Sequence, residues 1–447
     1  MTTEISDRTT LRGLASGRLG RDGTFERKPY WWDAAPRRET PSRTLPPKAD
    51  VVIVGSGFTG LSAALTLLGK GRSVVVLDSG VPGFGASTRN GGQIGSGNQK
   101  FRVKRLIELR GAEKAAALLR EGTRMLDYIE DLIAREKIDC YFRRCGRFRG
   151  AMRPAHYESM ARDMEDLRRV AGVESFMVPR SEQHSEIGSD RFFGGSVLPN
   201  DASLHPGLYH AGLLARVEER GGAVVGLAGA GAISREGKGF RVETGAGPVA
   251  CGEVLVATNG YTGGLIRPLR RRIVSIRSGL IATAPLSAET MARLMPKGRV
   301  YGNTNRVFYY FRAAPDEKRI VWGGRAGRFP GMRAFGHLAR DLLSVFPELG
   351  DTPVTHAWDG TIGYTYDELP HLGRMADGVH YAAGYCGTGV SRATYFGHKI
   401  ALQMTGDPDG RTAFDDLAFP AFPVRDAAQL AVPFVETWYR IRDYAGK

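Results

Sequence analysis

The alternation of apolar and polar positions predicts a βαβ unit between residues 51 and 78. Residues 51–54 form an uncharged β-branched run, which is typical of a parallel strand buried on both faces. Residues 61–68 form an apolar, helix-compatible run that ends at Gly69 and Gly71. A second uncharged strand pattern, residues 74–77, closes in Asp78. The order of these segments matches a strand, a crossover helix and a second parallel strand.

The rest of the chain alternates between helical and strand-like patterns, and it shows no internal repeat. Helical periodicity is clearest over residues 101–136 and 205–222. The other expected elements are a strand at 223–229, a meander around 240–244, a buried strand at 253–261, a strand-rich region at 273–355, and a strand, glycine loop and helix at 378–406.

Gly55, Gly57 and Gly60 stand between the first strand and the helix in the order G-x-G-x-x-G. In such a unit the first glycine allows the tight turn, the second admits a pyrophosphate, and the third lets helix and strand approach closely. The helix start offers free N–H groups and a positive dipole end. Asp78 ends the next strand, where a carboxylate accepts hydrogen bonds from ribose hydroxyls. We therefore predict a dinucleotide site; the alternative is a glycine-rich turn that binds nothing.

A second glycine-rich turn, "GYCGTGVS" at residues 384–391, precedes a helical pattern near the C-terminus. Two helix N-termini aimed at one long cofactor suit FAD. One receives the pyrophosphate, and the other faces the flavin edge that gains negative charge on reduction. A glycine-rich loop directly after Asp78 also favours FAD over a nicotinamide cofactor. Two unrelated helix turns are the alternative.

The predicted fold class is α/β (α+β two-domain), with a discontinuous Rossmann-like FAD-binding domain and an inserted mixed β-sheet substrate domain. The FAD-binding domain is expected at residues 48–100, 203–264 and 360–425. The helical and β-sheet substrate domain is expected at residues 101–202 and 265–359. Residues 1–47 form an N-terminal arm, in which "YWWDAAP" is a candidate anchor, and residues 426–447 form a C-terminal tail.

Five motifs occur in the order found in the D-amino acid oxidase-like (DAO) family of FAD-dependent oxidoreductases. They are "VVIVGSGFTGLSAALTL", "GFGASTRNGGQ", "ATNGYT", "DELPHLG" and "GYCGTGVS". The chain resembles this family over roughly residues 30–425, and it is most similar to the branch that contains gamma-glutamylputrescine oxidase. "GFGASTRNGGQ" is the most specific of the motifs. The resemblance implies a FAD-binding domain of the GR2/DAO type.

The motif and the resemblance together imply a set of FAD-binding residues from several segments of the chain. The loop after Asp78 runs along the pyrophosphate and isoalloxazine in that family, and the strand end at "ATNGYT" lies near the adenosine half. The implied cofactor-binding residues are Gly55, Gly57, Phe58, Thr59, Gly60, Asp78, Ser79, Ala86, Ser87, Arg89, Asn90, Gly91, Gly92, Gln93, Ala230, Thr258, Gly384, Gly387, Thr388, Gly389 and Val390.

The sequence departs from the family pattern at several positions. Thr388 stands where the family often has histidine, and Asp78 replaces the usual glutamate. Monomeric sarcosine oxidases tether flavin through a cysteine that would fall near Gly360, where this chain has none, so we expect non-covalent FAD. Those enzymes also carry an oxygen-activating lysine at a position that matches the region of Val321. Its absence keeps an acceptor other than oxygen open.

Candidate catalytic residues are Tyr309, Tyr310 and His371. Further aromatic residues that are candidates to line the flavin face are Phe311, Trp358, Tyr364 and Tyr366. For each of these aromatic residues the alternative is a place in the core or sheet. Arg277 and Arg312 are candidates to bind a carboxylate, and a surface ion pair is the alternative for both.

These observations predict an FAD-dependent oxidase of a primary or secondary amine or amino acid. The expected product is an imine that hydrolyses to an aldehyde or oxo acid, with hydrogen peroxide formed from dioxygen. The alternatives are a dehydrogenase that passes electrons to another acceptor, a flavin-dependent enzyme that modifies nucleic acid, and a flavin-holding scaffold without activity. The expected partners are a small amine or amino acid and O2 or another acceptor.

Composition narrows the classes of protein to which the chain can belong. The 447 residues suffice for two sizeable cores, and no apolar run is long enough to span a membrane. The four cysteines form neither a metal-binding pattern nor a disulfide pattern. We therefore expect no metal site and a cytoplasmic location. The net charge is +15, and we expect a basic surface or attraction of an anionic ligand rather than nucleic-acid binding. The oligomeric state stays open.

Overall fold

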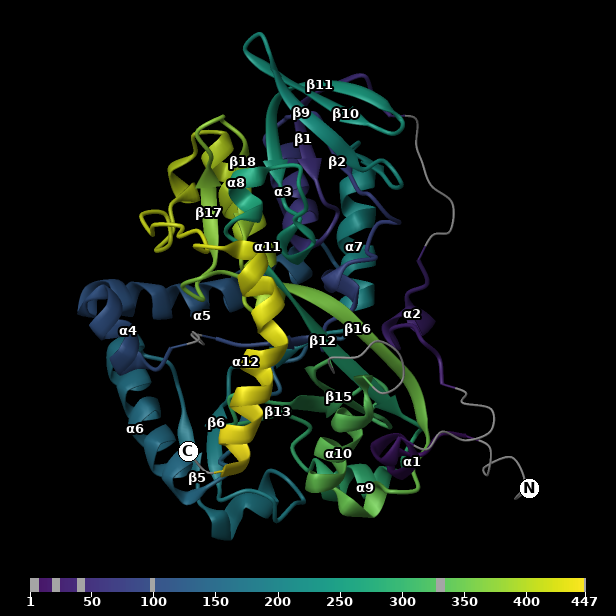
Figure 1. Cartoon of the computed structure of the whole chain (residues 1–447), viewed down its shortest axis with the longest axis vertical. Coiled ribbons are helices and arrows are strands. Elements are labelled where there is room, and N and C mark those ends of the chain that lie inside the picture. The colour runs from purple at the N-terminus through teal and green to yellow at the C-terminus, as the bar shows by residue number, and fades with distance from the viewer. Residues whose placement is uncertain (1–7, 18–24, 38–44, 97–100, 327–333, 446–447) are drawn as a thin grey trace.

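The computed structural model describes residues 8–17, 25–37, 45–96, 101–326 and 334–445. Two large sheets stand one above the other, as Figure 1 shows, with helices around both. The upper sheet contains β1, β2 and β11, and the lower sheet contains β12 to β16. This mixed arrangement of helices and sheets confirms the predicted α/β class.

The first sheet has the strand order β17-β18-β11-β1-β2-β8, extended at β11 by β10 and β9. Its central pairs are parallel: β1 with β2 and β11, β2 with β8, and β11 with β18. The strands are β1 (Lys48–Val54), β2 (Val74–Leu77), β8 (Ala223–Val225), β9 (Ala230–Glu236), β10 (Gly239–Thr244), β11 (Gly247–Val256), β17 (His371–Arg374) and β18 (His380–Ala383).

Three helices pack together against this sheet: α3 (Phe58–Gly69), α7 (Pro206–Glu219) and α11 (Gly389–Met404). Their shared core includes Ile53, Leu61, Tyr209 and Phe396, all fully or almost fully buried. The α3–α11 contact is very close, because a Cβ on Gly397 would lie 2.3 Å from the carbonyl oxygen of Thr59. The predicted βαβ unit at residues 51–78 is therefore present as β1, α3 and β2.

The second sheet has the order β16-β12-β15-β14-β13-β4-β6-β5. Its pairs are antiparallel except for β13 with β4. The strands are β4 (Arg147–Gly150), β5 (Phe176–Val178), β6 (Gly195–Leu198), β12 (Val274–Thr283), β13 (Val300–Asn303), β14 (Tyr310–Ala313), β15 (Ile320–Arg325) and β16 (Val354–Tyr364). It thus joins strands from both predicted pieces of the substrate domain. β16 pairs with β12 up to Tyr364, so this sheet extends beyond the boundary expected at residue 359.

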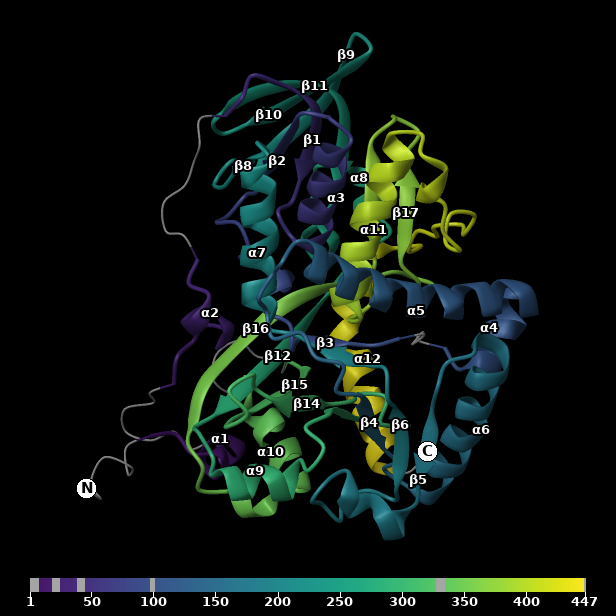
Figure 2. The same ribbon diagram turned by 180° about the vertical axis from the view of Figure 1, so that it is seen from behind.

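The remaining elements surround the two sheets, and Figure 2 shows them from behind. The helices are α1 (Leu11–Ser16), α2 (Trp31–Ala34), α4 (Val103–Arg110), α5 (Ala112–Arg135), α6 (Pro154–Ala171), α8 (Arg267–Arg270), α9 (Ala288–Leu294), α10 (Gly336–Val345) and α12 (Arg425–Ala445). The 3-10 turns are η1 (Ala86–Thr88), η2 (Arg180–Ser185), η3 (Asn259–Tyr261), η5 (Pro347–Leu349) and η6 (Pro408–Gly410), and β3 (Gln93–Ile94) pairs with β7 (Ala202–Ser203). Within the described ranges, no helix combines the length and hydropathy needed to cross a bilayer.

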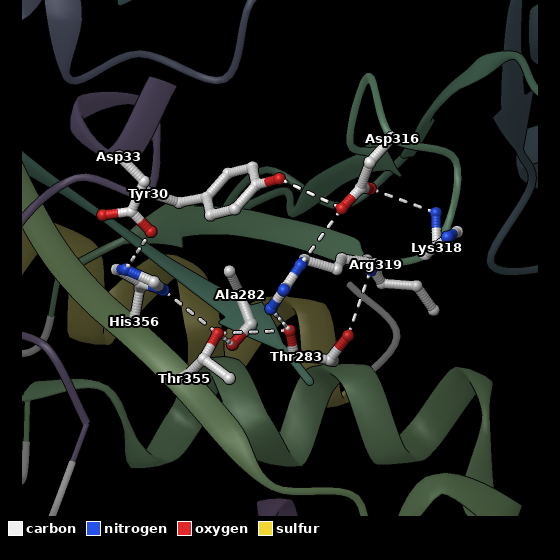
Figure 3. A network of polar contacts seen from close by, with 10 residues as sticks. Tyr30, Asp33, Ala282, Thr283, Asp316, Lys318, Arg319, Thr355 and His356 are labelled. Carbon is white, nitrogen blue, oxygen red and sulfur yellow. Dashed lines mark hydrogen bonds and ion pairs between the residues drawn. The ribbon is translucent and has the colours of Figure 1, made fainter. Parts of the chain in front are cut away.

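The segment predicted as an N-terminal arm packs against the second sheet through α2. Tyr30 donates a hydrogen bond to Asp316, which also accepts from Arg319. Nε2 of His356 lies 3.1 Å from an Asp33 carboxylate oxygen. Figure 3 shows these contacts between α2 and the strands beneath it. Polar contacts thus hold α2 on the second sheet.

Candidate cofactor and active site

A cavity of about 800 Å³ lies between the two sheets. One part of its wall comes from the ends of β1, β2 and β11 and from the N-termini of α3 and α11. The other part comes from β12, β14, β15 and β16 of the second sheet. This position at the carboxyl ends of parallel strands is where open α/β sheets bind ligands.

The turn between β1 and α3 depends on its glycines for different reasons. Gly55 adopts φ +108°, and a Cβ there would lie 2.9 Å from the carbonyl oxygen of Ala257. A Cβ on Gly60 would lie 1.9 Å from the carbonyl oxygen of Gly55. At Gly57 a Cβ would meet only the Ser87 hydroxyl, at 2.9 Å, and would otherwise point into open space. Gly57 therefore borders the cavity, whereas Gly55 and Gly60 serve close packing.

Asp78 closes β2 at the cavity wall and organises the turn beside it. Its Oδ2 accepts hydrogen bonds from the backbone N–H of Ser56 at 3.0 Å and from the Ser56 hydroxyl at 2.5 Å. Its Oδ1 accepts from the backbone N–H of Gly80 at 3.0 Å. A carboxylate oxygen has two lone pairs, so Oδ1 retains capacity to accept a ligand hydroxyl.

The loop of residues 83–93 forms one long side of the cavity and is rigidified from within. The amide nitrogen of Asn90 donates to the carbonyl oxygens of Ala86 and Ser87, and its Oδ1 accepts from Gly92 N–H. Arg89 donates to the carbonyl oxygens of Phe84, at 2.7 Å, and Asp359, at 2.9 Å. These bonds hold the loop in one conformation.

Three indole N–H groups fix the same loop from outside. Trp31 donates to the carbonyl oxygen of Asn90 at 2.8 Å, and Trp358 donates to that of Arg89 at 3.0 Å. Trp32 donates to the Thr88 hydroxyl at 2.9 Å. Trp31 and Trp32 belong to α2, so the N-terminal segment directly supports the cavity wall.

The start of α11 forms a further part of the cavity wall, next to the start of α3. Gly387, Thr388, Gly389 and Val390 line it, and no side chain caps the helix. The N-cap residue of α3, Gly57, has no side chain to cap the helix, and the Ser87 hydroxyl accepts from Phe58 N–H at 2.9 Å. The Thr59 and Tyr385 hydroxyls lie 2.7 Å apart and link the two helix starts. Two positive helix ends therefore face one cavity, which suits an elongated anionic ligand.

The second sheet supplies an aromatic and polar wall. The Tyr310 ring packs against Gly91 and Gly323, where Cβ atoms would lie 2.7 and 2.4 Å from ring atoms. Enclosure by protein raises the pKa of the Tyr310 phenol above its usual value. Arg325 donates from Nη2 to the Tyr364 hydroxyl at 3.0 Å. Its Nη1 is buried and has no hydrogen-bond partner among the described residues.

Comparison with known proteins agrees with this geometry. The profile of the DAO family, described as FAD dependent oxidoreductase, matches residues 50–403. The gamma-glutamylputrescine oxidoreductase of Escherichia coli (strain K12) is 31% identical over 408 residues, which cover 89% of this chain and 93% of that protein. The probable oxidoreductase OrdL of Rhizobium meliloti (strain 1021) is 30% identical over 424 residues, which cover 93% and 97%. The chain belongs to the DAO family of FAD-dependent oxidoreductases.

Solved structures show the same DAO fold. L-proline dehydrogenase from P. horikoshii superposes with a TM-score of 0.69 at 18% identity, covering 83% of this chain and 96% of that one. Glycine oxidase from Geobacillus kaustophilus gives a TM-score of 0.68 at 18% identity, covering 85% and 100%. At this level of identity the likeness establishes the architecture.

The cavity residues fit the FAD of the DAO family. Gly57 leaves open space beside the start of α3, which is the arrangement a pyrophosphate requires. Among the described lining residues, Asp78 is the single acid, and the basic residues are Arg89, Arg147, Arg325 and Arg392. Burial lowers the pKa of Arg392 to about 10, so it stays protonated at neutral pH. The cavity thus carries a net positive charge that favours the diphosphate.

The structure brings most of the predicted cofactor residues to this cavity. Gly60, Gly92 and Gly384 lie behind its surface, where they allow tight backbone packing. The predicted residues that line the cavity are Gly55, Gly57, Phe58, Thr59, Asp78, Ser79, Ala86, Ser87, Arg89, Asn90, Gly91, Gln93, Ala230, Thr258, Gly387, Thr388, Gly389 and Val390.

The substrate-side candidates separate into two groups. Tyr310 and Tyr364 line the cavity. Tyr309 and Phe311 lie on the other face of β14, where they pack with Trp322 in the core.

The other substrate-side candidates are engaged outside the cavity wall. His371 is stacked on Phe419 and bonded to Asp367. Trp358 is buried beneath the loop of residues 83–93, and Tyr366 is exposed against Phe422. Arg312 donates to backbone carbonyls in the interior, and Arg277 pairs with Asp359 at the surface.

Several lining residues had no sequence signal strong enough to identify them. Arg147, Arg325 and Arg392 come from three elements far apart in the chain. Arg325 follows two glycines at the end of β15, a place where a strand end can present a side chain to a ligand. Arg147 belongs to a basic cluster at residues 143–150 that has no motif of its own.

Proposed function

We propose that this enzyme oxidises a primary or secondary amine or an amino acid and passes the electrons to dioxygen. FAD, when bound, accepts a hydride from the carbon next to the substrate nitrogen. The resulting imine takes up water and separates into an aldehyde or oxo acid and an amine or ammonia. Dioxygen receives the two electrons and leaves as hydrogen peroxide.

The wall formed by the second sheet carries this proposal. It combines the aromatic rings of Tyr310 and Tyr364 with the guanidinium of Arg325. Such a wall can position a neutral amine and orient an attached polar or anionic group. The similarity to gamma-glutamylputrescine oxidoreductase, and the shared fold with glycine oxidase, support an amine substrate.

Arg325 is the residue we expect to orient the substrate. Its Nη2 is held by Tyr364, and its Nε lies 3.5 Å from a Glu436 carboxylate oxygen. Nη1 is left as a buried donor on a residue that lines the cavity. A carboxylate or carbonyl oxygen of the substrate would satisfy that donor, because guanidinium groups bind such oxygens strongly.

A dehydrogenase that uses another acceptor is the second candidate. Val321 occupies the strand position at which we expected an oxygen-activating lysine in related enzymes, and it is buried among apolar residues. The shared fold with an L-proline dehydrogenase supports this alternative.

The test is an anaerobic panel of γ-glutamylated polyamines, pipecolate, sarcosine and simple amines, followed by absorption of the oxidised flavin. At least one amine should bleach the flavin, and admitted air should restore it with release of hydrogen peroxide. Bleaching by a hydroxy acid instead of any amine would refute amine oxidation. Flavin that stays reduced in air would select the dehydrogenase. Acid precipitation should release the flavin into the supernatant, since we propose non-covalent binding.

A further inference from the structure

A second cavity of about 350 Å³ lies beside the first, between β4, α6 and the segment before β14. Five arginines line it: Arg102, Arg147, Arg149, Arg153 and Arg306. Arg147 lines both cavities, so the two adjoin at this residue. Nothing in the proposed reaction uses this concentration of positive charge.

Most of these guanidinium groups lack an acidic partner. Arg147 forms an ion pair with Asp201 at 2.6 Å. In the part of the chain that the structure describes, the other four form no ion pair with a carboxylate. Arg102 donates to the Ser159 hydroxyl, and Arg149 donates to the carbonyl oxygen of Asn303 at 3.2 Å.

The remaining two arginines make neutral contacts as well. Arg153 donates to the backbone carbonyl of Asp443. The Arg306 guanidinium lies over the Tyr439 ring, 5.3 Å from its centroid. Four like charges therefore border one hollow with no ion pair among the described residues, and Asp163 attracts Arg102 and Arg149 from beyond ion-pair distance.

The two carboxylates at the cavity are used to hold backbone groups. Asp443 accepts from the N–H groups of Arg306 and Val307, at 3.1 and 3.0 Å. Asp163 accepts from the N–H of Val103 at 3.0 Å. Five arginines against these two aspartates and Asp201, which pairs with Arg147, leave an excess of two positive charges at the wall.

His156 also lines this cavity and is affected by the same positive charges. Its pKa is lowered by burial and further by the nearby charges of Arg153, Arg102 and Arg149. Nδ1 lies 2.8 Å from the Thr304 hydroxyl. Enclosure by protein also lowers the pKa of Arg149. Repulsion of this kind is relieved when an anion binds among the arginines.

We propose that this second cavity binds an oxyanion, namely a carboxylate or phosphate group. Guanidinium groups match both geometrically, because two N–H donors of one arginine can meet two oxygens. The anion has two sources. It is either a separate small molecule or, if the proposed amine oxidation holds, the far end of a substrate that extends past Arg147. In the second case the enzyme prefers amines with a distal acidic group.

The first measurement is calorimetric titration of the FAD-loaded enzyme with glutarate and with inorganic phosphate, at constant ionic strength. We expect the enzyme to bind with a Kd in the millimolar range or below. In the double variant Arg149→Gln/Arg306→Gln the affinity should fall by at least about tenfold. Arg241→Gln, which removes an exposed arginine on β10, is the matched control and should bind as the unaltered enzyme does.

A second measurement separates a lost site from a damaged fold. Without anion, the double variant should have a higher Tm than the unaltered enzyme, because repulsion is relieved. Addition of phosphate should raise the Tm of the unaltered enzyme and leave the variant unchanged. Absence of binding by both anions, or equal binding by enzyme and variant, would overturn the proposal.

The source of the anion follows from kinetics with paired substrates. An amine with a distal carboxylate is compared with the corresponding amide. If the double variant has a raised KM for the carboxylate substrate and an unchanged KM for the amide, the anion in the second cavity is the distal end of the substrate. Unchanged KM values with lost anion binding identify a separate anion. If no amine reduces the flavin while glutarate or phosphate still binds, amine oxidation fails and the anion site stands.

Discussion

At the scale of single residues, two glycines of the β1–α3 turn have different roles. We expect Gly57→Val to abolish FAD binding with the fold intact, because a Cβ there enters open space next to the Ser87 hydroxyl. Gly60→Val should instead destabilise the protein by roughly 1–3 kcal/mol or more, since its Cβ would overlap the Gly55 carbonyl.

Flavin content after gel filtration and the Tm of the flavin-free proteins distinguish these effects. Gly69→Val, at the end of α3, is the control, because a Cβ at that glycine has no neighbour within 4 Å. Full flavin content in Gly57→Val would show that the pyrophosphate does not pass this turn.

Two neighbouring residues, Tyr309 just before β14 and Tyr310 at its start, show what sequence can and cannot say at this scale. Tyr309 and Tyr310 are chemically identical, and both were predicted as candidates. Consecutive strand residues face opposite sides of a sheet. The structure directs Tyr310 to the cavity and Tyr309 into the core. The order of faces depends on how the whole sheet is docked, which no local pattern encodes.

At the scale of elements, α2 is a short helix with a large structural effect. Trp31 and Trp32 donate hydrogen bonds to the loop of residues 83–93. The guanidinium carbon of Arg37 lies 3.8 Å from the centroid of the Trp32 ring. A hydrogen bond of this kind contributes about 1 kcal/mol. The double variant Trp31→Phe/Trp32→Phe should therefore bind FAD roughly tenfold or more weakly, since the loop loses two fixed points.

Fluorescence of released flavin on dilution measures that change. Trp438→Phe is the matched control, because Trp438 is 58% exposed on α12. Equal flavin release from the double variant and the control would mean that the loop holds its conformation without α2.

α12 shows that the pattern within an element does not determine how the element docks. An amphipathic helix usually buries its apolar stripe. Here Leu430, Phe434 and Trp438 are exposed. Gln429 instead exchanges hydrogen bonds with the backbone of Ser275, and Asp443 accepts from two backbone N–H groups. Specific polar contacts with the second sheet therefore set the orientation of the helix.

For the whole molecule, buried histidines couple stability to pH. Burial lowers the pKa of His205, His337 and His398 to about 4 each. Unfolded histidine has a pKa of about 6.5, so between these values the unfolded chain binds three more protons at these residues. Burial raises the pKa of Asp341 to about 6, which opposes the effect with one proton. Stability should therefore fall as the pH falls from 7 to 5.

The urea midpoint at pH 7 and pH 5 measures this loss. His205→Asn should reduce it, because Nδ1 of His205 accepts from Leu208 N–H at the start of α7 and an amide oxygen can accept without titrating. His184→Asn, at an exposed position, should leave the loss unchanged. A midpoint that does not depend on pH would contradict the assignment of neutral buried histidines.

The sequence by itself determined the βαβ unit, the class of fold, the family and FAD as the cofactor. Their signals are local, because tight turns, open backbone and helix starts require particular residues at fixed spacing, as at Gly55, Gly57 and Gly60. Only the tertiary structure decided which side chains meet across the cavity. Arg147, Arg325 and Arg392 come together from three distant elements, and the second arginine cavity forms between β4, α6 and the end of α12. Contacts of this kind depend on how two sheets are placed, and that placement results from packing summed over the whole chain.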